Sequence, residues 1–353
     1  MLERADLIRL GLGALYHTRA HRALEPASRG IGVIFTLHRI SAEREGNGVA
    51  EFAPNRILEL GGDFLAATIE RVRGHGLDIV PLDEARGRIL GGDDRRFAVF
   101  TVDDGYRDTH ERAWPIFQRH NCPFTLYVAT GLIDRTVKLW WIALERIIAG
   151  ADTIEASVSG RWLTLPCADA DDKRAAFQAL YWPLRAVGEA EKLDAITTLA
   201  ERHGVSIAAI AEELGMTCEQ LQEMARDPLV TIGAHTVSHA ALARLDERTM
   251  RRELADSRAR LGELIGREPR HLAYPYGDAG SAGKREFAAA AELGFETGVT
   301  TRKGVVTRAH AAHLTALPRV SLNGNLQDVR FIDVLISGVP FALMRGFRQL
   351  NVN

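Results

Sequence analysis

Short apolar runs that end in polar residues recur along this chain, and helical stretches separate most of them. The runs lie at 32–37, 78–82, 97–102, 123–128, 230–234, 272–274, 295–299 and 317–320. Their length and their content of β-branched and aromatic residues predict buried strands. Strands that alternate with helices are typical of parallel sheets. We therefore expect an α/β fold, a barrel with its functional groups at the C-terminal rim of the strands.

The strand–helix alternation stops in the middle of the chain. There the sequence predicts a helix start at 138–144, a hairpin around Ser159-Gly160, and further helices rich in Ala, Leu and Glu. We interpret this stretch as a cap of helices and one hairpin inserted into the barrel. The predicted organisation is an N-terminal amphipathic helix at 1–28, the barrel at 29–330 with its insertion at about 133–227, and a helical extension at 331–353.

The composition is that of an ordinary globular protein. Of the 353 residues, 46% are hydrophobic and 25% are charged, which suits one large domain with additions. The net charge of −2 gives no support to nucleic-acid binding. The cysteines Cys122, Cys167 and Cys218 are odd in number and far apart, so they indicate neither a disulfide framework nor a thiolate metal cluster. A reducing compartment is the simpler interpretation.

The N-terminal segment contains a short apolar run, Leu10–Tyr16, that a glycine interrupts. We predict an amphipathic helix rather than a signal peptide or a transmembrane span, and hence a cytoplasmic protein. This helix would pack on the barrel exterior; the alternative is a peripheral membrane contact through its arginines and leucines. The apolar segment 331–350, with Arg345 and Arg348, predicts a packed helix pair with the same alternative. Nothing in the sequence indicates the oligomeric state.

Two adjacent acids, Asp103 and Asp104, follow the run 97–102 directly, and Gly105 permits the chain to turn after them. Side chains of neighbouring residues point opposite ways in a strand, but at a strand end both can reach one cavity. A solvated turn or a helix N-cap is the common alternative for such a pair.

Two histidines follow the run 230–234. His235 and His239 are four residues apart, which places both imidazoles on one face if a helical turn follows. Together with one carboxylate they predict a three-ligand metal site with open positions for water and substrate. Two histidines and one carboxylate also describe the site of Fe(II) oxygenases. That class predicts a jelly roll of consecutive strands, and the helices between the strands argue against it.

Three stretches, in this order, resemble the motifs of the polysaccharide deacetylase family, whose domain is shared with the nodulation chitooligosaccharide deacetylases. They are Val102-Asp103-Asp104-Gly105, His235-Thr236-Val237-Ser238-His239 and Tyr274-Pro275-Tyr276-Gly277, and the resemblance extends roughly from Gly32 to Val320. It implies a distorted (β/α)₇ barrel. It also implies a metal-dependent hydrolase that removes N-acetyl groups from an N-acetylated sugar polymer or oligosaccharide, and thus a carbohydrate substrate.

The resemblance assigns roles to individual residues. Asp104, His235 and His239 would bind the divalent metal, with Zn²⁺ expected first and Co²⁺ as the alternative, and Asp103 would be the general base. A second carboxylate beside the ion, but not bound to it, can take the proton of the activated water. The backbone N–H of Tyr276 would donate to the oxyanion, and Tyr276 would also contact the substrate.

The sequence departs from the family pattern at two points. The arginine that usually braces the base is missing from the third motif, where Ala273 or Tyr274 stands, and we expect Arg319 to brace Asp103 instead. The late Leu-x-His-Asp motif that supplies the acid is not visible. His38 is a candidate catalytic acid, the alternative being a structural histidine; His310 and His313 rank below it.

Two neighbouring tryptophans, Trp140 and Trp141, are candidates for a substrate-binding wall on which a sugar ring stacks, the alternative being an anchor in the core.

Two other functions remain open for the site that the motifs predict. One is hydrolysis of a formamide or another linear amide. The other is a glycan-binding relative with weak or no catalysis, which the missing arginine and acid motif would explain.

Overall fold

Seven parallel strands close into a barrel. The computed structural model describes residues 4–41, 51–91, 93–346 and 350–352. Within these residues the sheet order is β1-β12-β11-β10-β9-β6-β5, and pairing of β1 with β5 closes it. The strands are β1 Gly32–Leu37, β5 Phe97–Val102, β6 Phe124–Val128, β9 Val230–Ala234, β10 His271–Ala273, β11 Thr297–Lys303 and β12 Leu317–Ser321. The predicted (β/α)₇ barrel is therefore confirmed.

The barrel strands are buried on both faces. Every residue of β1, β5 and β6 is buried, which explains why these strands appear in the sequence as continuous apolar runs rather than alternating ones.

The predicted strand at 78–82 is much shorter in the structure. β4 comprises only Asp78–Ile79 and pairs with the start of β5 outside the closed barrel. Pro81 cannot donate to a ladder, and α4 begins directly after it.

Amphipathic helices surround the barrel. They include α3 Gly62–Gly74, α4 Leu82–Ile89, α5 Trp114–Arg119, α12 Glu247–Ile265 and α13 Lys284–Glu292. The inward face of α12 carries Met250, Leu254, Ser257 and Leu261, which recur at helical spacing. Asp246 caps this helix by accepting a hydrogen bond from the Thr249 N–H, and Gly266 ends it in the left-handed conformation.

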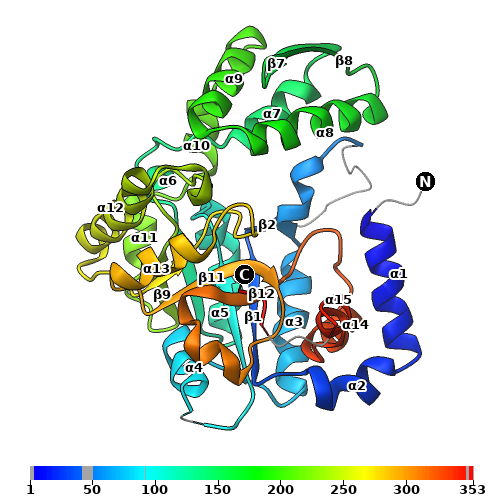
Figure 1. The fold of residues 1–353 in the computed structure, drawn as a ribbon, viewed down its shortest axis with the longest axis vertical. Coiled ribbons are helices and arrows are strands. Elements are labelled where there is room, and N and C mark those ends of the chain that lie inside the picture. The colour runs from blue at the N-terminus through cyan, green and yellow to red at the C-terminus, as the bar shows by residue number, and fades with distance from the viewer. Residues whose placement is uncertain (1–3, 42–50, 92, 347–349, 353) are drawn as a thin grey trace.

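The insertion forms a cap over the C-terminal rim of the barrel (Figure 1). It contains α7 Trp140–Ala149, the hairpin β7 Thr153–Val158 and β8 Arg161–Pro166, then α8 Ala170–Ala186, α9 Glu189–Arg202 and α10 Ile207–Leu214. These elements share a second hydrophobic core, which also includes Tyr106, Ala129 and Leu132 from the segments after β5 and β6. The next helix, α11 Cys218–Met224, packs Leu221 and Met224 into the barrel core instead. The separate core of the cap thus ends before α11.

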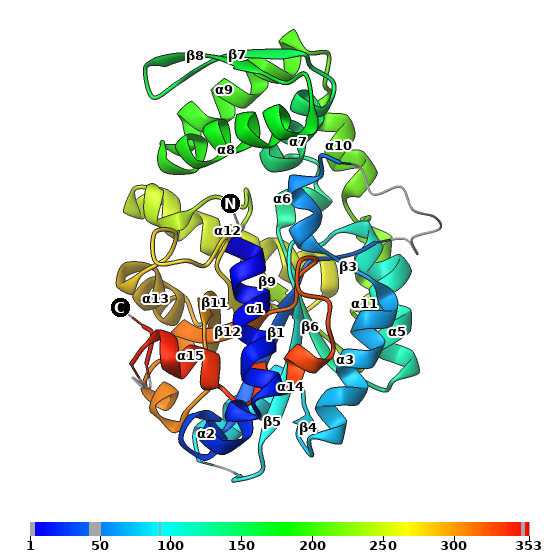
Figure 2. The same cartoon turned by 90° about the vertical axis from the view of Figure 1, so that its right-hand side faces the viewer.

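The two ends of the chain meet on the outside of the barrel. The N-terminal segment forms two helices, α1 Arg4–His17 and α2 Ala20–Ser28, which break at Arg19 in the left-handed conformation. They lie beside α14 Arg330–Ile336 and α15 Val339–Met344 (Figure 2). Residues 1–3 and 347–349, Arg348 among them, lie outside the described residues. No helix in the described ranges has the length and apolarity that crossing a bilayer requires.

Candidate active site

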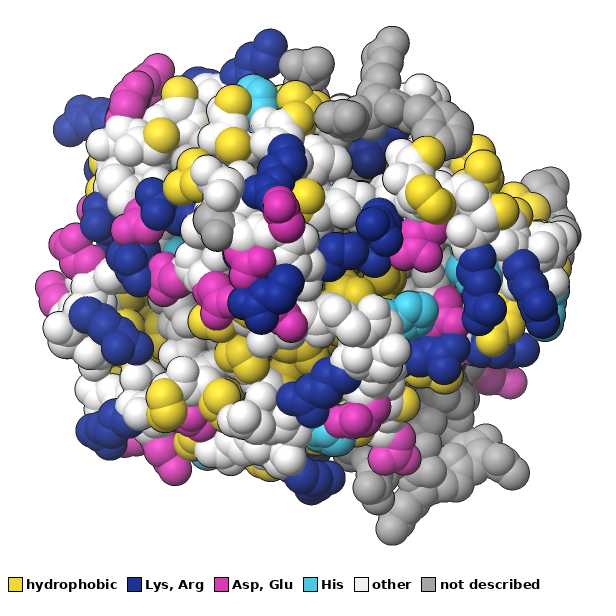
Figure 3. Space-filling view, turned by 90° about the horizontal axis from the view of Figure 1, so that it is seen from below, with side chains coloured by type: hydrophobic (Ala, Val, Ile, Leu, Met, Phe, Trp, Pro, Cys, Tyr) yellow, Lys and Arg dark blue, Asp and Glu magenta, His cyan; other side chains and the backbone are white. Residues whose placement is uncertain are grey.

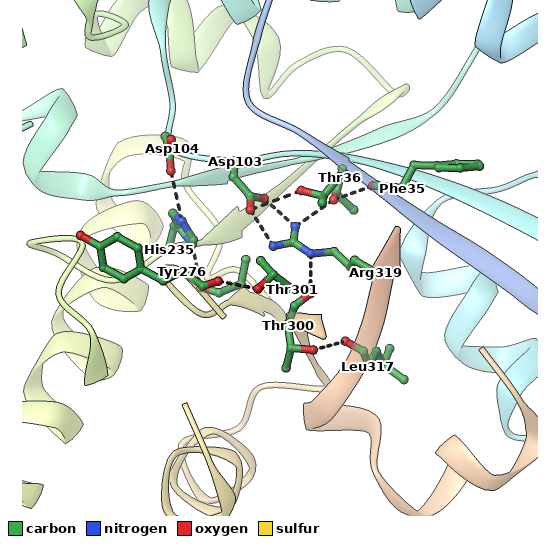
Figure 4. A network of polar contacts seen from close by, with 12 residues as sticks. Phe35, Thr36, Asp103, Asp104, His235, Tyr276, Thr300, Thr301, Leu317 and Arg319 are labelled. Carbon is green, nitrogen blue, oxygen red and sulfur yellow. Dashed lines mark hydrogen bonds and ion pairs between the residues drawn. The ribbon is translucent and has the colours of Figure 1, made fainter. Parts of the chain in front are cut away.

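The candidate residues lie at the end of the barrel that the cap covers, and Figure 4 shows several of them close together. Asp103 and Asp104 follow the last residue of β5, and His235 follows the last residue of β9. Tyr276 comes three residues after β10, and Arg319 lies within β12. Because all these strands are parallel, their C-terminal ends meet at one rim, and residues distant in sequence become neighbours.

Asp104, His235 and His239 converge on one point. One carboxylate oxygen, Oδ1 of Asp104, lies 3.2 Å from Nε2 of His235 and 3.2 Å from Nε2 of His239. One ligand atom from each residue lies within 4.8 Å of the other two, and all three side chains are buried. The structure therefore brings together the three residues that the sequence predicts as ligands.

A looped backbone, not a helical turn, brings the two histidines together. Residues 235–239 form no helix, and Thr236 and His239 both have positive φ, 64° and 58°. Glu253 of α12 holds this loop by accepting hydrogen bonds from the backbone N–H groups of Val237 and Ser238, each at 2.9 Å. The helical turn that would place both imidazoles on one face does not form, and contacts with α12 hold the loop instead.

The chain also reverses sharply at the acid pair. Asp104 has a φ of 79° and Gly105 a φ of 91°, so the backbone enters the left-handed region directly after Asp103. Such a conformation is disfavoured for a residue with a Cβ and is found where surrounding contacts impose it. This reversal lets Asp104 face the histidines while Asp103 faces β12 (Figure 4).

The donor atoms fit a divalent cation. The Nδ1–H of His235 donates to the carbonyl of Ala273 at 2.7 Å, which leaves the Nε2 lone pair directed at Asp104. Asp104 Oδ1 is buried and accepts no hydrogen bond from the described residues. Two imidazoles and one carboxylate oxygen that face each other across a small space are the donor set of zinc sites with open positions. The three residues could hold such an ion, and the set does not identify the metal.

Asp103 forms a buried bidentate ion pair with Arg319. Nη1 of Arg319 donates to Oδ1 at 2.7 Å and Nη2 donates to Oδ2 at 2.6 Å, and the two side chains are 0% and 3% exposed. Arg319 also donates to the hydroxyl of Thr101 at 3.0 Å and to the carbonyl of Thr300 at 2.9 Å. Burial by itself would raise the pKa of Asp103, but the charge and hydrogen bonds of Arg319 outweigh it and lower this pKa below its ordinary value.

His38 lies at the same rim, half-buried. It follows Leu37, which pairs with Val102 across β1 and β5, and the Asp103 N–H donates to the Leu37 carbonyl at 3.0 Å. Its positive form would lower the pKa of both Asp103 and Asp104, which places it within electrostatic reach of the site.

The other candidate histidines lie elsewhere. Nδ1 of His310 is hydrogen-bonded to the Thr307 N–H at 3.0 Å, and the neighbouring Val306 pairs with Gly32 at the start of β1. His310 is therefore near the opposite end of the barrel, where burial lowers its pKa to about 4. His313 is only three residues further along, so neither histidine reaches the rim.

The two tryptophans differ in their relation to the site. Trp140 is 1% exposed; it stacks on Tyr181 and donates its Nε1–H to the hydroxyl of Tyr276 at 2.8 Å. Trp141 is 5% exposed, and its ring centroid lies 4.9 Å from that of His239. Trp140 therefore has no free face on which a sugar could stack, as the core alternative predicts. Trp141 directly borders the group formed by Asp104, His235 and His239.

Residues of the cap and of β11 were not found by sequence reasoning. Arg185 of α8 places its guanidinium carbon 3.6 Å from the centroid of the Tyr276 ring, and Lys192 of α9 is buried nearby. Thr301 of β11 donates its hydroxyl to the Tyr276 carbonyl at 2.5 Å. A cation on an amphipathic helix ordinarily indicates a solvated face, so nothing in the sequence distinguishes Arg185 and Lys192 from other surface charges.

Comparison with known proteins agrees with this geometry. The family model described as polysaccharide deacetylase matches residues 190–298, which include the second and third motifs but not Asp103 and Asp104. YxkH of Bacillus subtilis (strain 168), which is named as a polysaccharide deacetylase, is 28% identical over 123 residues. That match covers 35% of this chain and 42% of YxkH, less than half of the relative's length.

Solved structures of deacetylases share the fold. Streptococcus pyogenes deacetylase PplD, solved in complex with acetate, gives a TM-score of 0.53 at 16% identity, covering 83% of this chain and 92% of PplD. IcaB from Ammonifex degensii gives a TM-score of 0.51 at 17% identity, with coverage of 83% and 92%. At such identities the likeness concerns the fold. Taken with the sequence match, it confirms that this chain resembles the polysaccharide deacetylase family, as its three motifs predict.

Proposed function

We propose that this chain is a metal-dependent hydrolase that removes N-acetyl groups from an N-acetylated sugar of a polysaccharide or oligosaccharide. The observation that carries the proposal is the convergence of Asp104, His235 and His239 on one point, beside a second carboxylate that is not part of the group. Amide hydrolysis requires an activated water, a stabilised oxyanion and a protonated leaving amine. The residues at the rim can be matched to each requirement.

Asp104, His235 and His239 would hold the ion, with Zn²⁺ expected first and Co²⁺ as the alternative. When bound there, a divalent ion lowers the pKa of a water molecule to about 7 and polarises the substrate carbonyl. Asp103 would accept the proton of that water. The bidentate grip of Arg319 keeps Asp103 ionised and fixes its orientation, while a carboxylate has lone pairs left to accept a further proton.

The backbone N–H of Tyr276 would stabilise the oxyanion. It makes no hydrogen bond to any other described residue, so it is available to a ligand. Removing one oxyanion donor in comparable hydrolases lowers kcat by about 10² to 10³. His38 is the candidate acid for the leaving amine, because its imidazole is half-buried at the same rim and within electrostatic reach of both acids.

Acetate release tests this proposal. The full chain, loaded with Zn²⁺ or Co²⁺, is incubated with N-acetylglucosamine oligomers and with peptidoglycan. We expect acetate from the wild type and none above background from Asp103→Asn with its metal content intact. No acetate from any of these substrates, from protein shown to contain one ion per chain, would contradict the proposal. If the protein instead released formate from an N-formylated substrate under the same conditions, its activity would be hydrolysis of a formamide.

A further inference from the structure

We propose that the cap is part of the catalytic apparatus, with Arg185 as a positioning residue that fixes the loop carrying the Tyr276 N–H. This inference rests on the proposed function for its kinetic consequence, but its structural basis is independent. The loop 274–278 connects β10 to the region before α13, and three helices of the cap contact it.

The loop backbone has a conformation that requires support. Tyr276 and Gly277 both have a φ of 61°. The left-handed region is unfavourable for tyrosine, because its Cβ approaches the following carbonyl. A Cβ at Gly277 would lie 2.5 Å from the backbone nitrogen of Thr301, so glycine is required there. The direction of the Tyr276 N–H depends on this strained pair of residues.

The barrel supports the loop from one side. The hydroxyl of Thr301 donates to the Tyr276 carbonyl at 2.5 Å, and the Thr301 N–H donates to the Gly277 carbonyl at 3.0 Å. These bonds fix the carbonyls of the loop to β11. They leave the Tyr276 side chain to be held by other elements.

The cap holds that side chain. The Trp140 Nε1–H of α7 donates to the Tyr276 hydroxyl at 2.8 Å, and the Arg185 guanidinium of α8 lies 3.6 Å from the ring centroid. Arg185 also donates to Asp278 at 2.9 Å and to Ser281 at 3.1 Å, so it binds the ring and the loop after it together. Nζ of Lys192, on α9, is 5.8 Å from the same ring.

The Tyr276 side chain is thus held at its hydroxyl by Trp140 and at its ring face by Arg185, both far away in sequence. A planar guanidinium that stacks on a ring and also forms hydrogen bonds cannot be replaced fully by a lysine ammonium. Because the Tyr276 N–H is expected to act on the oxyanion, which forms only as the reaction proceeds, loosening the loop should lower kcat more than it changes KM.

Arg185→Gln tests the inference, and Arg146→Gln is the matched control. Arg146 is also a cap arginine in an ion pair, with Glu213, but among the described residues it makes no polar contact with the Tyr276 loop. For Arg185→Gln we expect kcat to fall about tenfold or more, towards the effect of losing one oxyanion donor, with KM within about twofold. Arg185→Lys should recover part of the loss, and Arg146→Gln should match the wild type.

A second readout does not depend on turnover. Hydrogen–deuterium exchange in the peptide covering 274–281 should be faster in Arg185→Gln than in the wild type or Arg146→Gln. Unchanged exchange and unchanged kcat would overturn the inference. If the wild type released no acetate, the proposed function would fail, and the exchange measurement alone would decide whether the cap holds the loop.

A different observation points to a second inference, which concerns the terminal helices. Among the described residues, five of the nine exposed large hydrophobic side chains lie on α1, α2 and α15: Leu7, Leu10, Leu24, Leu343 and Met344. On α1, Leu7 and Leu10 share one exposed face, whereas Leu12 packs against Phe331 and Val334 on the other side. The helix is therefore apolar on both faces, and only one of them is covered.

This surface is also positively charged. Residues 4–29 and 339–346 contain six arginines and two acids, a net charge of +4 in a chain whose net charge is −2. Arg19, Arg22 and Arg29 form no ion pair with any described acid. Acidic and basic side chains are interspersed over much of the face seen from below in Figure 3. We infer that the α1–α2–α15 surface docks on an anionic lipid bilayer, since exposed leucines beside unpaired arginines complement such a surface.

Co-sedimentation with vesicles tests this surface. We expect the wild type to pellet with vesicles of phosphatidylglycerol and phosphatidylcholine, less at high salt, and not with phosphatidylcholine alone. Leu7→Ser combined with Leu10→Ser should lose most of the binding, whereas Leu90→Ser, at a leucine 51% exposed on the barrel, should bind as the wild type does. Binding that survives the double substitution would overturn the inference. So would no vesicle binding, or a dimer in sedimentation that the double substitution dissociates.

Discussion

Charged pairs occur both at the barrel rim and in the cap, and they differ in burial. At the rim, Arg319 and Asp103 are 0% and 3% exposed and meet in a bidentate pair within the strands of the barrel. In the cap, Arg146 and Glu213 also meet in a bidentate pair, at 2.9 and 2.8 Å, but their side chains are 39% and 56% exposed. The rim pair is shielded from water and the cap pair is not. Losing the rim pair should therefore lower the free energy of unfolding more than losing the cap pair does.

The largest expected effect comes from breaking the ligand group at the rim. His235→Ala removes one of three converging donor atoms. We expect loss of the bound divalent ion and acetate release at background, and EDTA should do the same to the wild type reversibly. Metal content and acetate release are measured together on each sample. An active, metal-free His235→Ala protein would show that the group is not the catalytic centre.

Next in size is the rim pair itself. Arg319→Ala leaves a buried carboxylate without its partner, and we expect a loss of about 3 to 5 kcal/mol in the free energy of unfolding. Urea denaturation of both proteins measures it. The cap substitution Arg146→Ala should cost less than about 1 kcal/mol, since exposed pairs are weak. Similar losses for the two variants would mean that burial does not distinguish the pairs.

A smaller effect is expected where the cap meets the rim. Trp140→Phe keeps a buried aromatic ring but removes the hydrogen bond to the Tyr276 hydroxyl. We expect a fall in kcat of a few-fold, less than that of Arg185→Gln, because Arg185 holds the ring and the loop together. Steady-state kinetics measures the difference. A larger fall for Trp140→Phe than for Arg185→Gln would reverse the proposed order of these contacts.

The smallest expected effect is on how the free energy of unfolding depends on pH, at an ion pair far from the rim. Asp333 of α14 is buried and bound to Arg71 and His75; burial would raise its pKa, but these partners outweigh it and lower the pKa. Its stabilising contribution is therefore present above the unfolded pKa, about 4, and is lost as pH falls through the lower folded value. Asp333→Asn should cost about 1 to 2 kcal/mol at pH 7. The difference from wild type should vanish in acid; a constant difference at all pH values would contradict this.

The sequence predicts those site residues that follow strand ends. Asp103, Asp104 and His235 each come directly after an apolar run, and parallel strands bring their ends to one rim whatever the loops do. Arg319 lies within the short strand β12, next to β1, so the same parallel arrangement brings it to the rim. The barrel itself follows from the alternation of strands and helices.

Features set by contacts between distant segments could not be predicted. The spacing of His235 and His239 suits a helical turn, but Glu253 holds the segment between them as a loop. Trp140 reads equally well as a binding wall or a core residue until its contact with Tyr276 is known. Arg185 has no local signal, because its role depends on how the cap docks on the barrel.

The most direct test of the account is the stoichiometry of metal binding. Metal-free protein is titrated with Zn²⁺ by calorimetry, for the wild type, His239→Ala and Asp103→Asn. We predict one ion per chain in the wild type and in Asp103→Asn, and greatly weakened or no binding in His239→Ala. Full binding by His239→Ala, or no binding by the wild type, would contradict the claim that these three side chains form a metal site.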